Sequence, residues 1–177
     1  NGSVTGDVTI RNSGRVESWE GSVIGRASIV DEGPNPFLVG GAGLTTTGSL
    51  EIVASGSVTQ NGPINAAGLS VAGSTITLLN PGNILSGASG ANPLSASAPG
   101  GVQLYSSTGL TLGTITSVDP GTTPLGSIYI AAPSFILNGS SSVSANGPGD
   151  AVILNVFGGV GVASFVNTNP GAASPIT

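Results

Sequence analysis

The chain has 177 residues, three of them basic and eight acidic, and it contains no histidine, cysteine or methionine. Nucleophilic triads that need His or Cys, soft-metal sites and disulfide bonds are therefore excluded, because their reacting atoms are missing. A net charge of −5 argues against nucleic acid as a partner, and the lack of any apolar run of about 18 residues argues against membrane insertion.

Residues 1–47 hold most of the charge, and only Asp119 and Asp150 follow Glu51. We predict that this part forms charged N-terminal coils or a cap, because charged side chains protect an open sheet edge from pairing with another strand. The alternative is a contact surface around the single tryptophan, Trp19, formed by Arg11, Arg15, Glu17, Glu20 and Arg26.

Residues 48–168 are predicted to form short strands. Glycine and proline recur so often that a helix of ordinary length is not expected. Apolar residues at alternate positions, as in Leu50-x-Ile52, are typical of strands. Apolar anchors recur in triplets, which are Leu50, Val58, Ile64; Leu69, Ile76, Ile84; Val102, Leu110, Ile115; Ile128, Phe135, Val143; and Val152, Val160, Phe165.

The triplets begin 19, 33, 26 and 24 residues apart. These intervals are roughly the length of one three-sided coil, with insertions in the longer cases, and they indicate an all-β parallel β-helix, or β-solenoid. Two stretches rich in Pro, Gly and Ser, Leu85–Gly100 and Ser117–Gly126, are predicted to leave the ladder as loop insertions. An antiparallel sandwich is the competing architecture, but no Asn-Gly pair has the flanking alternation of a tight hairpin. Residues 169–177 are predicted to link to a following module.

A family resemblance appears at Ser49–Gly87, which reads SLEIVASGSVTQNGPINAAGLSVAGSTITLLNPGNILSG. This stretch resembles the passenger repeats of filamentous-haemagglutinin-type adhesins, exported by two-partner secretion, and LLNPGN at 78–83 is similar to their L-x-N-x-x-N element. The resemblance implies a right-handed parallel β-helix in a secreted or cell-surface bacterial protein. It also implies a role in adhesion or as a rigid fibre, and we expect the chain to be part of a larger exported protein.

Carboxylates are the only catalytic groups left to consider. Asp119 and Asp150 both stand in turn contexts, where aspartate is common for structural reasons, and no basic side chain accompanies them. Asp31 and Glu32 are the only adjacent acids, and an acidic pair is too few ligands for calcium. We therefore expect no catalytic residue, no metal and no cofactor, and the protein is predicted not to be an enzyme.

Two contact surfaces are predicted. Aligning the triplets places Glu51, Ser70, Gln103, Tyr129 and Ile153 in one outward row, and Gln103, Tyr105 and Tyr129 are candidates for contact with a glycan or a partner. An ordinary ladder of stacked side chains is the alternative. The other surface is an uncapped C-terminal layer that would contact a neighbouring module or another copy of the chain end to end, through Val156, Phe157, Val160, Val162 and Phe165.

The sequence thus predicts a non-enzymatic structural or adhesive segment that forms a rigid β-helical stalk outside the cell or on the bacterial surface. Its expected partners are neighbouring modules, other copies of itself, and host-cell or surface glycans. Two alternatives stay open: a carbohydrate-binding or carbohydrate-processing β-helix, and a subunit of a self-assembling extracellular filament.

Overall fold

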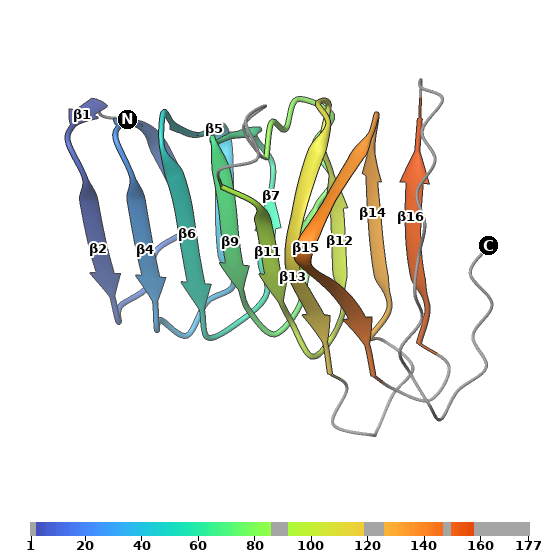
Figure 1. Cartoon of the computed structure of the whole chain (residues 1–177). Helices are drawn as coiled ribbons and strands as arrows, with labels where there is room; N and C mark the ends of the chain where they lie inside the picture. Colours follow the sequence, from blue (N-terminus) through green and yellow to red (C-terminus); the bar gives the residue numbers. More distant parts are fainter. Residues whose placement is uncertain (1–2, 86–91, 119–125, 147–149, 158–177) are drawn as a thin grey trace.

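The computed structural model describes residues 3–85, 92–118, 126–146 and 150–157, and in these residues the chain folds as a parallel β-solenoid of about six turns. Two sheets face each other and run side by side along the length of the molecule (Figure 1). The described residues contain no helix, and hence none that could cross a membrane.

The first sheet, sheet A, consists of β1 (Ser3–Thr5), β3 (Trp19–Ile24), β5 (Phe37–Thr46), β7 (Val58–Gln60), β10 (Ile76–Leu78), β12 (Val102–Tyr105), β14 (Ile128–Ala132) and β16 (Val152–Val156), with β8 (Ile64–Asn65) paired to β5. The second sheet, sheet B, consists of β2 (Val8–Asn12), β4 (Ala27–Asp31), β6 (Ser49–Ala54), β9 (Gly68–Ala72), β11 (Leu94–Ser97), β13 (Leu110–Ser117) and β15 (Phe135–Ala145). Every pairing between these strands is parallel.

The winding is right-handed. In Figure 1 the strands of sheet B lie nearer the viewer and run downward, β14 and β16 of sheet A run upward, and successive turns advance from left to right. This is the hand expected of parallel crossovers, because right-twisted strands return to their own sheet readily only in that sense.

The core lies between the sheets and is made of apolar side chains stacked in register. Alternation along each strand sends every second residue inward. In sheet B, for example, Ile52 pairs with Ile29 on one side and with Val71 on the other, and all three are buried. The corresponding inward row of sheet A contains Phe37, Val58, Ile76, Val102, Ile128 and Val152.

The predicted insertion at Leu85–Gly100 is wrong in part, because it contains strand β11. This strand pairs with β9 and with β13, so it continues the ladder of sheet B. Pro93 and Pro99 flank the strand and leave its amides free to pair, which is why the high proline content did not exclude it. The second predicted insertion falls mostly on residues 119–125, which lie outside the described residues.

Because β11 was not predicted, the predicted triplets do not all begin on the same sheet. Leu50 and Leu69 begin their triplets on sheet B, whereas Val102, Ile128 and Val152 begin theirs on sheet A. The anchors in the described strands are inward-facing as predicted, but equivalent places in the first two triplets and in the last three lie on different sheets.

The charged N-terminal part is built on the same two sheets as the rest. Val8 pairs with Ala27, and Ala27 pairs with Leu50, so sheet B continues from β2 through β4 to β6. Residues 169–177, the predicted linker, lie outside the described residues.

Candidate functional site

The outer surface of sheet A near its C-terminal end brings together the three predicted contact residues. Gln103 on β12 is in register with Tyr129 on β14, and Tyr105 lies two residues beyond Gln103 on the same face of β12. Gln103 is exposed, and both tyrosines are partly exposed. We call these residues, with Asn155 and Phe157 described below, the aromatic–amide patch.

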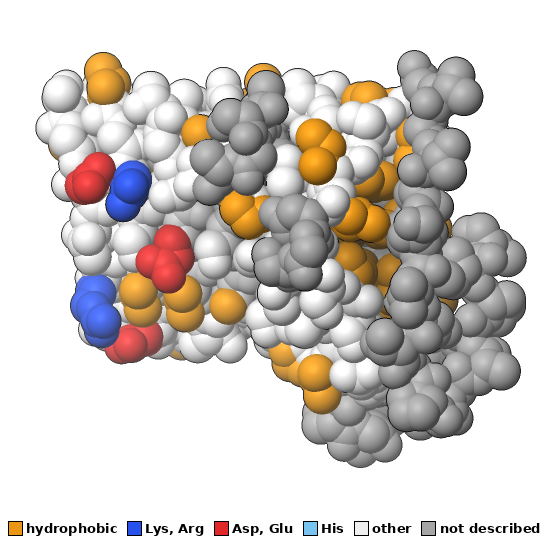
Figure 2. Space-filling model, in the orientation of Figure 1, with side chains coloured by type: hydrophobic (Ala, Val, Ile, Leu, Met, Phe, Trp, Pro, Cys, Tyr) orange, Lys and Arg blue, Asp and Glu red, His pale blue; other side chains and the backbone are white. Residues whose placement is uncertain are grey.

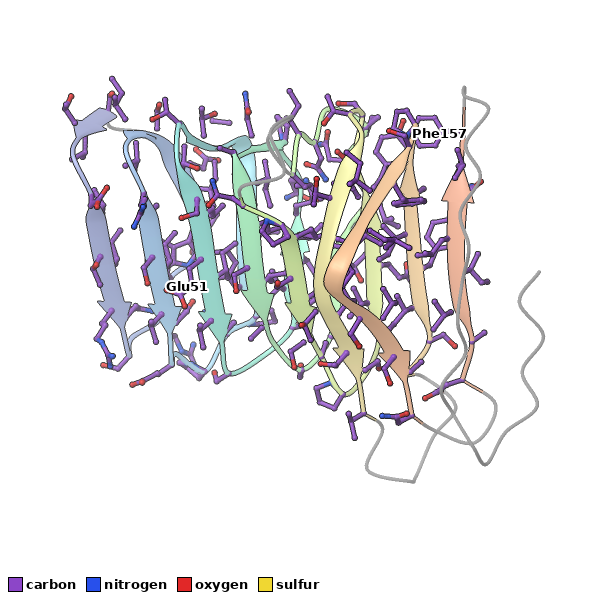
Figure 3. All side chains as sticks on the ribbon, viewed as in Figure 1. Glu51 and Phe157 are labelled. Carbon is purple, nitrogen blue, oxygen red and sulfur yellow. The ribbon has the colours of Figure 1, made fainter. Side chains whose placement is uncertain are left out.

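The predicted outward row is wrong for its first two residues, Glu51 and Ser70. Glu51 and Ser70 are neighbours of each other, but on β6 and β9 of sheet B. Figure 3 shows Glu51 on the nearer sheet, far from the labelled Phe157 at the opposite end of the solenoid. The reason is strand β11, which the predicted alignment left out. The later triplets were therefore aligned one strand out of step with the earlier ones, on the other sheet.

Two residues that follow on β16 and just after it complete the patch. The rings of Tyr105 and Phe157 stack with their centroids 5.0 Å apart and an interplanar angle of 10°. The Asn155 amide nitrogen donates to the Tyr129 hydroxyl oxygen at 3.1 Å. Ala131 is the register neighbour of Tyr105 and of Asn155, and its small side chain leaves room for the two rings to meet.

The surroundings of the aromatic–amide patch are uncharged. Its neighbours along the outer row, Thr77 and Ile153, are neutral. Of the two acids after Glu51, Asp119 lies outside the described residues and Asp150 is only 5% exposed. The described patch therefore offers ring faces, a phenol hydroxyl and amides, without a nearby exposed charge.

The predicted end-to-end surface is only partly described. Val156 pairs with Ala132 in sheet A, and the Phe157 ring turns back onto Tyr105. Val160, Val162 and Phe165 lie outside the described residues. The end-to-end contact stays a prediction, which sedimentation over a range of protein concentrations would test.

The N-terminal tryptophan belongs to the packing of the first turns. The Trp19 ring stacks on Phe37 with centroids 5.7 Å apart, and its indole N–H donates to an Asp31 carboxylate oxygen at 3.2 Å. The other Asp31 oxygen accepts from Asn12 Nδ2 at 2.8 Å and from the Gly33 N–H at 3.0 Å. Asp31 is 4% exposed, so these bonds replace the water that its carboxylate loses.

The charged residues predicted around Trp19 lie mainly at the surface. Arg11, Arg15, Glu17 and Arg26 are exposed, and Glu20 accepts a hydrogen bond from the Ala42 N–H at 3.3 Å. In Figure 2 the charged side chains on the visible face gather over the first turns, and the described surface farther along that face is neutral.

Two acids weighed in the sequence analysis, Asp31 and Asp150, are both withdrawn from the surface. Asp31 is buried and hydrogen-bonded, and Asp150 is buried, so neither presents its carboxyl group to solvent. Within the described ranges no group of three or more metal-ligating side chains occurs.

A buried polar network that was not predicted from the sequence lies inside the solenoid. Asn83 is 0% exposed, and its side chain bonds the Gln60 amide as well as backbone groups of Ile64, Leu78 and Tyr105. The LLNPGN stretch was a signal for the asparagine, but nothing local to Gln60 marked it as the partner.

The fold defines a protein of the parallel β-solenoid class with an aromatic–amide patch on one face. Comparisons with protein-family models, with curated proteins and with solved structures found no match to this chain.

Proposed function

We propose that this chain is a non-enzymatic structural and adhesive segment of a secreted or cell-surface bacterial protein, in which it serves as a rigid stalk. The observation that carries the proposal is the continuous parallel ladder, which runs in sheet B from β2 to β15 and in sheet A from β1 to β16. Each turn is joined to the next by backbone hydrogen bonds and by inward rows of stacked side chains.

Such a ladder supports the mechanical part of the proposal. A solenoid bends or breaks only where two neighbouring turns separate from each other. Here the inward residues of the central turns hold the turns together and are fully buried; examples are Ile52, Val58, Ile76, Leu104 and Ile128. The Asn83 side chain adds bonds to the turns before and after its own. A load applied along the axis is then shared between two sheets.

The adhesive part, and the placement outside the cell, are supported by the resemblance at 49–87 and by the aromatic–amide patch. The patch also favours one second candidate, a carbohydrate-binding β-helix. A surface that combines phenol rings with amides suits sugar recognition better than a sheet face without these groups does.

The experiment is bead attachment combined with an assay for turnover. Beads that carry the chain are expected to attach to epithelial cells above the level of beads coated with an unrelated acidic protein. Polysaccharides incubated with the chain are expected to gain no reducing ends. Attachment at the control level would overturn the adhesive function, and new reducing ends would overturn the non-enzymatic assignment.

A further inference from the structure

We propose that the aromatic–amide patch binds neutral carbohydrate, with Tyr105 and Tyr129 offering ring surface and Gln103 and Asn155 offering amide groups. The proposal rests on the adhesive function above and names the ligand class that would be recognised. The patch extends over β12, β14 and β16, which at the usual strand spacing is about 10 Å. This extent suits a short stretch of a glycan lying across the sheet.

The chemistry of the patch matches that of a sugar. A pyranose ring has apolar C–H faces, which pack on aromatic rings, and a rim of hydroxyl groups, which both donate and accept hydrogen bonds. Amide side chains likewise donate and accept. Gln103 is exposed and lies directly beside Tyr129 in the register, so a hydroxyl near the Tyr129 ring is within reach of an amide.

The patch is held in place before any ligand arrives. The Tyr105 ring is stacked on Phe157, and the Tyr129 hydroxyl is bonded by Asn155. Side chains that are already ordered lose little entropy on binding, and this increases affinity. Because the face is an open sheet without a described pocket, we expect a dissociation constant on the order of 1 mM for a short oligosaccharide.

The neutrality of the patch selects between classes of glycan. The three arginines lie at or before Arg26, several turns from β12, and the nearest described acid, Asp150, is buried. A polyanionic glycan would find no cation to pair with, whereas a neutral one meets no desolvation penalty from an exposed charge. The ligand is therefore expected to be uncharged.

The test is affinity electrophoresis in native gels. At pH 8 the chain is acidic and migrates toward the anode, and a neutral polysaccharide cast into the gel retards it relative to a non-binding reference protein only if it binds. The probes are hydroxyethyl cellulose, galactomannan and dextran, with dextran sulfate as the anionic counterpart. We expect retardation by at least one neutral probe, with binding about fivefold to tenfold weaker in Tyr105→Ala and in Tyr129→Ala.

Controls separate loss of the ligand surface from loss of the fold. Gln103→Ala leaves the Tyr105–Phe157 stack in place and should still weaken binding. Thr77→Ala changes the neighbouring position in the same row, and Ser70→Ala changes the outer face of sheet B, so both should bind as the parent does. Far-ultraviolet circular dichroism checks that each variant keeps its sheet content.

Three results would overturn the proposal: no retardation by any neutral probe, retardation that survives both tyrosine substitutions, or retardation by dextran sulfate alone. The bead experiment keeps the two proposals apart. Beads that attach to cells while no neutral probe retards the chain would disprove carbohydrate binding and leave adhesion standing. Retardation without attachment would disprove the adhesive function alone.

Discussion

Asn83 and Gln60 exchange two hydrogen bonds between their side-chain amides, and this pair joins consecutive turns inside the solenoid. Asn83 Nδ2 donates to Gln60 Oε1 at 2.8 Å, and Gln60 Nε2 donates to Asn83 Oδ1 at 2.9 Å. The same Asn83 oxygen accepts the Ile64 N–H at 2.8 Å. A buried polar side chain satisfied in this way is tolerated inside the protein, and it favours one register of the turns over others.

Replacing Asn83 with alanine should destabilise the protein strongly. The substitution leaves the buried Ile64 N–H without its acceptor and removes both Asn83 bonds from the half-buried Gln60 amide, which keeps its bond to the Gly62 carbonyl oxygen. A buried group left without a partner costs about 1 to 3 kcal/mol. We expect the free energy of unfolding to fall by about 2 to 4 kcal/mol, measured by urea denaturation. Asn65→Ala is the control, because Asn65 is exposed. Equal effects of the two substitutions would contradict the role assigned to Asn83.

Gly43 should not tolerate a side chain, whereas Gly41 should. Gly43 has φ +79°, and a Cβ atom there would collide with the Pro63 carbonyl oxygen of the next turn. Nothing lies within 4 Å of a Cβ atom placed at Gly41. We expect Gly43→Ala to lower the free energy of unfolding by about 1 to 3 kcal/mol. Gly41→Ala should change it by less than about 0.5 kcal/mol, and a reversed order would show that this corner is built differently.

Asp31→Asn should loosen the first turns and be visible in the fluorescence of Trp19, the only tryptophan. The carboxylate accepts three N–H bonds, whereas an asparagine oxygen in the same place leaves an NH₂ group facing one of these donors. The expected loss is about 1 to 3 kcal/mol, with tryptophan emission shifted to longer wavelength. Glu32→Gln, at the exposed neighbouring position, should leave the emission unchanged.

Ile52 and Val53 offer a matched test of which side of β6 faces the core. Ile52 is 0% exposed and Val53 is 38% exposed, although they are adjacent in the chain. We expect Ile52→Ala to lower the free energy of unfolding by about 2 to 5 kcal/mol and Val53→Ala by less than about 1 kcal/mol. Similar losses at both positions in urea denaturation would mean that both faces of sheet B are covered.

The predicted fold is confirmed because its signals are local. Gly and Pro spacing leaves no room for long helices, and the alternation at Leu50-x-Ile52 states which side chains turn inward. Of the candidate patch, Gln103, Tyr105 and Tyr129 were identified from the sequence, since one strand and its register neighbour suffice to place them together. Phe157 and Asn155 were not assigned to it, because their contacts depend on how the last described strand returns.

The composition alone excluded His- and Cys-dependent chemistry, and the repeated apolar pattern favoured stacked parallel strands over an antiparallel sandwich. The sheet on which each outward residue lies became known only from the folded chain. The reason is that alternation has the same period on both sheets. Missing one strand, such as Leu94–Ser97 within a Pro-rich stretch, therefore assigns all later residues to the wrong sheet without any conflict in the local pattern. Glu51 and Gln103, which look equivalent in the sequence, therefore face opposite sides of the molecule.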